Sequence, residues 1–140
     1  MTDTVEISTD KSRLDVPMIH WFLSEESYWA KNIPLDMVQR SIDNSLCFGV
    51  YVGEQQVGFA RVITDHTTMA YVSDVFILPS HRGRGLSKQL MQHIIDEPAL
   101  QGLRRWILVT DDAHALYARF GFVNPEEPQT YMHRRLISRY

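Results

Sequence analysis

One segment near the middle of the chain joins an apolar, β-branched run to an amphipathic helix through a tight basic turn. The run ends at Pro79, and the turn after it contains Gly83 and Gly85. Glycine lets a backbone approach a ligand closely, and the first amides of a helix have no intrahelical acceptors. Because the helix dipole adds partial positive charge there, the turn predicts a cradle for a phosphate or pyrophosphate. Its basic side chains are Arg82, Arg84 and Lys88.

This turn differs from two common phosphate loops. It lacks the spacing of a nucleoside triphosphate loop and the first glycine of a dinucleotide fingerprint. It does match Arg-x-x-Gly-x-Gly/Ala at Arg82, Gly85 and Ser87, with serine at the third position. In this it resembles the acetyl-CoA pyrophosphate loop of the GNAT superfamily of N-acetyltransferases. A plain helix cap is the alternative interpretation.

A second motif follows the apolar run 106–109. Residues 110–122 are similar to the later GNAT signature Asn-x-x-Ala-x-x-Leu-Tyr-x-x-x-Gly-Phe, with Thr110 where the family has asparagine. The Leu116-Tyr117 pair falls within a predicted helix, and Gly121 suits the left-handed residue that ends it. The two motifs occur in the family's order.

The chain length of 140 residues suits a single domain, 1–140. Periodicity predicts strands at 5–8, 46–52, 56–63, 69–78, 104–109 and 131–137, and helices at 15–23, 34–42, 85–96 and 112–120. This order predicts an α/β (α+β) fold with a mixed, mainly antiparallel sheet of six to seven strands and about four helices. The resemblance implies a GNAT fold in which the central parallel strands, 74–78 and 104–109, splay apart.

Bulk properties narrow the function classes. Lys and Arg number 14 against 17 Asp and Glu, a net charge of −3, which argues against a nucleic-acid partner. No apolar run approaches the roughly 20 residues of a membrane span, and the first residues lack a secretory pattern, so we expect a cytoplasmic protein. Cys47, the one cysteine, lies in an apolar run typical of a structural thiol. The histidine spacings predict no metal site.

The resemblance implies acetyl-CoA as cosubstrate, bound in the gap between the splayed strands. Its pantetheine arm would contact the strand at Val75, Phe76 and Ile77, with Thr110 in the asparagine position. Its pyrophosphate would lie on the turn and the head of the helix: Arg82, Gly83, Arg84, Gly85, Leu86, Ser87 and Lys88. Acetyl would pass directly to a primary amine of a small molecule, amino acid or peptide. Tyr117 stands at the general-acid position, and a core tyrosine is the alternative.

The general base is less clear from sequence. An alkylamine has a pKa near 10.4, so only about one molecule in a thousand is neutral at pH 7. Residues 104–109 contain no acid. The candidates are therefore Asp74, on the cofactor strand, and Asp65, in the turn before it and expected near the acceptor side. Either could instead serve a solvated turn.

The acceptor pocket is expected on the segment between the first two helices. The candidates there are Tyr28, Trp29 and Glu25, with Arg61 on a neighbouring strand, and aromatic faces of this kind can hold a cation. A core role for the aromatics is the alternative. Two other functions stay open: a non-catalytic acyl-CoA sensor with the same fold, and an unrelated nucleotide-binding domain. The sequence also leaves a homodimer open.

Overall fold

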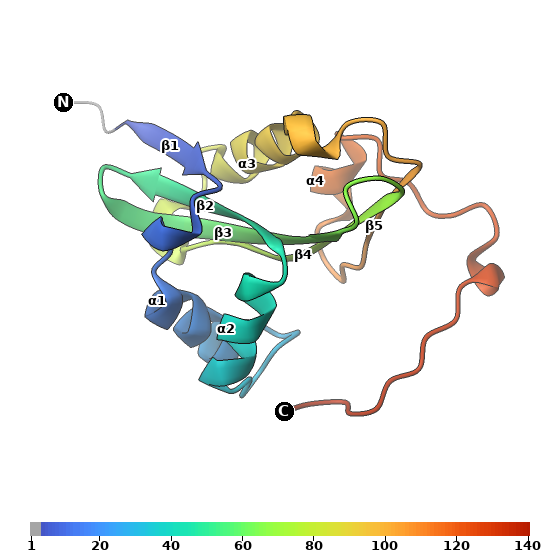
Figure 1. Ribbon diagram of the computed structural model, residues 1–140, viewed down its shortest axis with the longest axis horizontal. Helices are drawn as coiled ribbons and strands as arrows, with labels where there is room; N and C mark the ends of the chain where they lie inside the picture. The colour runs from blue at the N-terminus through green and yellow to red at the C-terminus, as the bar shows by residue number, and fades with distance from the viewer. Residues whose placement is uncertain (1–3) are drawn as a thin grey trace.

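A five-stranded sheet forms the centre of the computed structural model, which describes residues 4–140 (Figure 1). The strands follow one another across the sheet in chain order, and all neighbours are antiparallel except β4 and β5, which are parallel. The strands are β1 (Val5–Ser8), β2 (Leu46–Val52), β3 (Gln55–Thr64), β4 (Met69–Ile77) and β5 (Arg105–Leu108).

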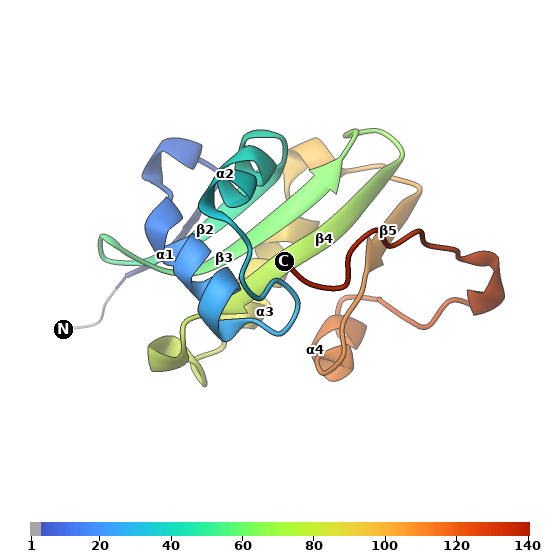
Figure 2. The ribbon, with the colours of Figure 1, turned by 90° about the horizontal axis from the view of Figure 1, so that it is seen from below.

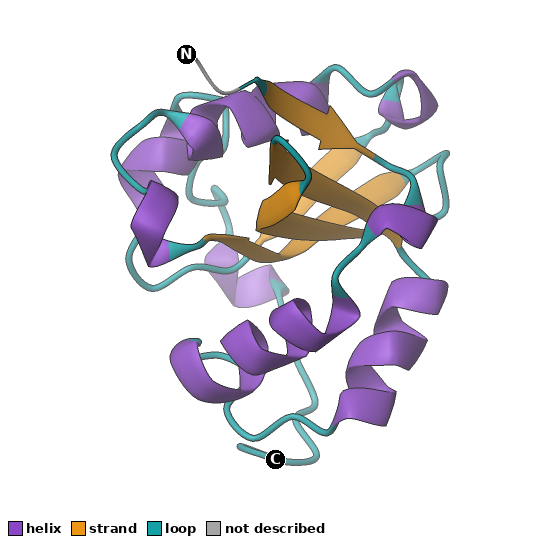
Figure 3. Cartoon of the chain, turned by 90° about the vertical axis from the view of Figure 1, so that its left-hand side faces the viewer, coloured by secondary structure: helices purple, strands orange, loops and turns teal. Residues whose placement is uncertain are grey.

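Helices cover both faces of this sheet, as the view from the side shows (Figure 3). α1 (Val16–Trp21), extended by a π-helical turn at Phe22–Glu26, lies with α2 (Leu35–Asp43) on one face (Figure 2). α3 (Leu86–Ile95) and α4 (His114–Ala118) lie on the other. The apolar side chains divide accordingly into two buried clusters, one between the sheet and α1–α2 and one beneath α3 and α4. Burial of these two clusters supplies the main drive to fold.

β4 changes character along its length. Ser73 pairs with Arg61 and Phe76 pairs with Phe59, so two β4 residues lie opposite a single residue of β3. This β-bulge places Asp74 at a φ of +52°, a left-handed conformation that aspartate tolerates better than most residues. On its other side β4 pairs with β5 only from Met69 to Val72, so the rest of β4 has no partner there.

The number of strands is the main correction to the sequence prediction. Instead of six to seven strands, the described residues form five, and the expected strand 131–137 is irregular and exposed. A strand forms only where another edge accepts its hydrogen bonds, and residues 131–137 find no such edge in their own chain. The chain beyond α4 instead leaves the body of the molecule (Figure 1).

The predicted helices are all present, and α4 is shorter at both ends than the expected 112–120. α1 begins as predicted, since the Asp15 carboxylate accepts from the Met18 amide at 3.1 Å and Pro17 occupies the first turn. Across residues 4–140 no helix has the length and apolarity to cross a membrane.

Candidate active site

The basic turn between β4 and α3 takes a conformation that requires its glycines. After a 3-10 turn at Pro79–His81, Gly83 has a φ of +80° and Gly85 a φ of +75°. A Cβ atom at either position would meet no atom within 4 Å. The left-handed backbone, rather than crowding, therefore selects glycine here.

The amides of this loop form an unsatisfied row. Within the described residues, none of the backbone N–H groups from Gly83 to Lys88 has an acceptor, although the Gly85 carbonyl accepts from Gln89 at 3.1 Å to begin α3. Six consecutive donors thus lie at the positive end of a ten-residue helix. Such a row is the backbone arrangement that binds phosphate groups.

The basic side chains of the loop divide into two roles. The Arg82 guanidinium donates through Nε to the Ile77 carbonyl at 2.9 Å, which ties the loop to the end of β4. Arg84 and Lys88 are exposed and form no ion pair within residues 4–140. Two unpaired cations therefore flank the amide row.

The end of β4 offers its backbone to the gap. Phe76 is buried and stacks on Phe22 with ring centroids 3.9 Å apart, while Val75 and Ile77 pack toward the cluster under α3. Because β5 stops pairing at Leu108, the β5-facing side of these three residues has no strand beside it. Their contribution to a ligand in the gap would come from the main chain.

Three of the predicted site residues converge on one carboxylate. The Asp74 oxygens accept from Arg61 Nε and from the Trp29 indole Nε1, each at 2.8 Å. The Asp74 and Arg61 side chains are only 10% and 16% exposed. Arg61 also donates to the hydroxyls of Ser45 and Ser73 at 3.2 and 3.5 Å. This network fixes the bulge and holds Trp29 against it.

Two tyrosines lie on the opposite side of the gap. The Tyr28 hydroxyl accepts from the Asp111 amide at 3.1 Å, which joins the segment after α1 to the loop after β5. Burial raises the pKa of Tyr117 to about 12, and the neighbouring Tyr28 and Asp112 raise it further. Within the described residues the Tyr117 hydroxyl has no hydrogen-bond partner. Tyr117 is thus a protonated phenol with its donor unused.

Comparison with known proteins identifies this combination of loop, gap and tyrosine. Residues 16–122 match the family model described as Acetyltransferase (GNAT) family. A Gibberella zeae protein provisionally named an acetyltransferase is 36% identical over 135 residues, which cover 81% of this chain and 75% of that protein. The chain belongs to the GNAT acetyltransferase family.

Solved structures agree with this assignment. A provisionally assigned GNAT-family acetyltransferase from Xanthomonas campestris pv. campestris superposes with a TM-score of 0.93 at 56% identity, covering 97% of this chain and 96% of that one. Agreement this close over nearly the whole chain includes the segment after α4. A predicted acetyltransferase from Clostridium acetobutylicum, solved with acetyl-CoA, shares the fold with a TM-score of 0.72 at 15% identity, covering 95% and 96% of the two chains.

Thr110 has a local role in this GNAT chain. Its hydroxyl accepts from the amides of Asp112 and Ala113 at 3.4 and 3.1 Å, which shapes the turn into α4. The side chain lies beside the gap, at the end of β5, and already serves as a turn-forming acceptor. The threonine therefore supplies the local backbone contacts, and its carbonyl and amide are the groups left for a ligand.

The structure does not bring Asp65 to the gap. Asp65 precedes the first residue of β4, whereas the gap opens at the other end of that strand. Its carboxylate accepts from the amides of Thr67 and Thr68 at 3.0 and 2.7 Å and from the Thr68 hydroxyl at 2.7 Å. These hydrogen bonds hold its pKa well below the usual range. Asp65 builds the β3–β4 turn.

Glu25 and Cys47 complete the set of sequence candidates. Glu25 lies in the exposed π-helical turn before Tyr28, with its carboxylate unpaired in the described part of the chain. Cys47 is buried on β2, and burial raises the pKa of its thiol to about 11. A thiol that stays protonated away from the gap is a structural one.

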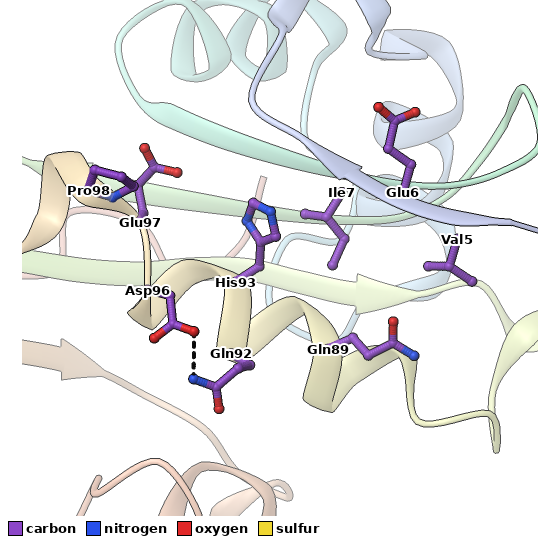
Figure 4. A pocket seen from close by; sticks show the side chains of 9 residues that line it. All are labelled: Val5, Glu6, Ile7, Gln89, Gln92, His93, Asp96, Glu97 and Pro98. Carbon is purple, nitrogen blue, oxygen red and sulfur yellow. Dashed lines mark hydrogen bonds between the residues drawn. The ribbon is translucent and has the colours of Figure 1, made fainter.

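Two cavities lie outside this region. One of about 650 Å³ is bordered by β1 and the polar face of α3 and includes none of the predicted site residues (Figure 4). There Gln92 donates to Asp96 at 2.9 Å. The other, of about 700 Å³, lies along β5 and α4 and includes Thr110 and Tyr117. No cluster of three metal-ligating side chains occurs among residues 4–140.

Sequence reasoning missed how the site residues are connected. Arg61 and Trp29 were predicted as acceptor contacts, and the structure shows both bonded to Asp74. Ser45 and Ser73, which complete the Arg61 contacts, carried no signal in the sequence. One signal was available for Asp65: the residue before a strand lies at the opposite end from the loop that follows the strand.

Proposed function

We propose that this GNAT protein transfers acetyl from acetyl-CoA directly to a primary amine. One observation carries the proposal: the six unsatisfied amides from Gly83 to Lys88 lie at the end of β4, where β4 and β5 have parted. A diphosphate on the amide row would direct the rest of the cosubstrate into the gap. The acetyl-CoA complex of the Clostridium acetobutylicum fold neighbour supports this choice of ligand.

The unpaired side of β4 suits an extended pantetheine arm. Its amide groups can pair with main-chain N–H and C=O groups of Val75, Phe76 and Ile77, as an added strand would. Arg84 and Lys88 supply positive charge beside the diphosphate. The thioester would then lie toward Tyr117 and Thr110, across the gap.

The chemistry requires one bond to form and one to break. The neutral amine nitrogen attacks the thioester carbonyl, and the tetrahedral intermediate expels the coenzyme A thiolate as the C–S bond breaks. The Tyr117 hydroxyl donates its proton to the departing sulfur and regains one from water. A phenol with a pKa of about 12 stays protonated throughout the neutral range, as a general acid must. Cys47 takes no part, so no acyl-enzyme forms.

Asp74 is proposed as a positioning residue rather than as the base. Both of its oxygens already accept hydrogen bonds, from Arg61 and from Trp29. A carboxylate held in this way orders the bulge and the indole more readily than it takes a proton from a substrate. The amine proton is therefore assigned to solvent water in the gap.

The acceptor side favours a cationic amine with an apolar group beside it. Tyr28 and Trp29 pack edge to face with centroids 5.0 Å apart and remain 52% and 40% exposed. The exposed acids Glu25 and Asp111 flank them in sequence or through the Tyr28 hydrogen bond. Aromatic faces with negative charge nearby attract a protonated amine before it loses its proton.

The decisive experiment is release of free thiol from acetyl-CoA with a panel of amines, alongside titration of acetyl-CoA binding. We expect binding without any amine and turnover with arylalkyl amines or peptides that begin with an apolar residue. Tight binding with no turnover on any amine would instead identify a sensor. Stabilisation by ATP or NAD that exceeds stabilisation by CoA would contradict both.

A further inference from the structure

The last 18 residues form an exposed arm. The C-terminal arm, residues 123–140, is exposed along its whole length and swings away from the body (Figure 1). Its apolar side chains are among the most exposed in the molecule: Val123 at 83%, Met132 at 95%, Leu136 at 78% and Ile137 at 57%. Soluble proteins seldom leave such a series of apolar side chains uncovered.

A groove of matching shape lies on the body. The β5 groove, a cavity of about 700 Å³, has β5 and its continuation to Thr110 on one side and residues 122–125 on the other. Trp106, Leu108 and Phe122 are among its apolar lining residues. Within the described residues β5 has a strand partner only on its β4 side. The groove therefore has an open sheet edge along one wall, with unpaired N–H and C=O groups.

We propose that the C-terminal arm of a second copy of this chain fills the β5 groove. Residues 131–137, whose sequence favours a strand, would pair along the outer edge of β5 in the partner, and the partner's arm would do the same in return. Each copy thus becomes six-stranded, and the exposed apolar side chains of both arms are covered. The contact is reciprocal, as a two-fold dimer requires.

The hinge explains why the arm enters the partner rather than its own body. Pro125 and Pro128 lie between the groove and the arm strand, and Pro128 opens a 3-10 turn at Pro128–Thr130. Proline fixes φ and biases the residue before it toward extended backbone, which opposes a tight reversal into the adjacent groove. Short, stiff hinges favour exchange of elements between copies.

Two further observations favour a second copy of the same chain. The arm carries Arg134, Arg135 and Arg139, whereas the loop at the end of the β5 groove carries the exposed acids Asp111 and Asp112, so the surfaces are complementary in charge. The Xanthomonas campestris structure agrees over nearly the whole chain, so its C-terminal segment also leaves the body. A course shared at 56% identity indicates a binding role for the arm.

The exchange would also affect the candidate active site. Tyr117 and Thr110 both line the β5 groove. A partner strand there would close the side of Tyr117 that faces away from β4 and exclude water from it. The dimer itself does not depend on acetyl transfer, so its test is independent of the proposed function.

The mass in solution gives the first test. Light scattering on the full chain should give twice 16.3 kDa. Leu136→Asp should shift the protein to monomer, because a charge would enter the groove, whereas Glu127→Lys in the exposed hinge should stay dimeric. Circular dichroism on both variants checks that the body still folds. A monomeric parent chain at micromolar concentration would overturn the proposal.

Cross-linking distinguishes exchange from an arm folded onto its own body. Ile107→Cys on β5 is prepared in one chain, and His133→Cys, Arg134→Cys or Arg135→Cys in another, with buried Cys47 retained as background. The two chains are unfolded together, refolded and oxidised. We expect a disulfide-linked heterodimer in the mixture with at least one arm position and none with the parent chain. A chain carrying both cysteines that closes only within itself would contradict the exchange.

Discussion

The two ends of β4 carry the same residue type in opposite circumstances. At the start, Asp65 closes a turn with several hydrogen bonds, and β4 there pairs with strands on both sides. At the far end, Asp74 occupies a left-handed bulge, and β4 has lost its β5 partner. One end is saturated with hydrogen bonds, whereas the other leaves main-chain groups available. A binding site forms where the fold leaves its polar groups unpaired.

The largest effect is expected where those free groups are most concentrated. Gly85→Val should weaken acetyl-CoA binding by about 100-fold or more, because a β-branched residue resists the left-handed conformation and displaces several donors. Gly102→Val is the matched control, since Gly102 has a φ of +78° and equally open surroundings at the opposite end of α3. Calorimetric titration and melting on both variants make the comparison. Equal loss of binding in the two variants would mean that the loop glycine is only structural.

Tyr117→Phe should lower kcat by about 100-fold and leave the Kd of acetyl-CoA unchanged, since a positioned acid contributes roughly that factor. The pKa of about 12 adds a second prediction: kcat of the parent enzyme should not fall between pH 8 and pH 10. A Tyr117 that titrated near its ordinary pKa would produce such a fall. Folding stability follows the same sign: the raised pKa supports the folded state below pH 10 and loses that support as pH rises toward 12.

Asp74→Asn should destabilise the protein by about 2–3 kcal/mol, because it leaves the largely buried Arg61 without its counter-charge. Glu6→Gln, which breaks the exposed pair with Arg13, should cost less than about 0.5 kcal/mol and serves as the control. We expect KM for the amine to rise about tenfold, because Trp29 loses its anchor. The acid limb of the kcat/KM pH profile should persist. Its disappearance would identify Asp74 as the base.

The smallest effect on activity is expected at the other end of β4. Asp65→Ala should lower the melting temperature by a few degrees at pH 7 and leave thiol release unchanged. Because the pKa of Asp65 is lowered in the fold, its contribution to stability is present above pH 4 and fades as the pH falls further. The melting temperatures of parent and variant should therefore converge in acid. A loss of turnover in Asp65→Ala would show that the two ends of β4 are coupled.

The sequence predicted this fold well wherever the signal was local. Four of the five strands and the loop at Gly83 and Gly85 follow from periodicity and glycine chemistry, and their bounds differ from the prediction by a residue or two. The bulge at Asp74 could not be predicted, because it depends on register against β3 and on contacts with Arg61 and Trp29 from distant segments. Residues 131–137 have a strand-like sequence, but local pattern does not specify which sheet edge they join.

Amide hydrogen exchange with and without acetyl-CoA tests the central claim most directly. In the free protein the amides from Gly83 to Lys88 should exchange fast, because they are unpaired, and on addition of acetyl-CoA they should slow together with those of Val75 and Ile77. The amides of Thr67 and Thr68, already bonded to Asp65, should not change. Protection that appears elsewhere while the amides from Gly83 to Lys88 continue to exchange fast would contradict this account.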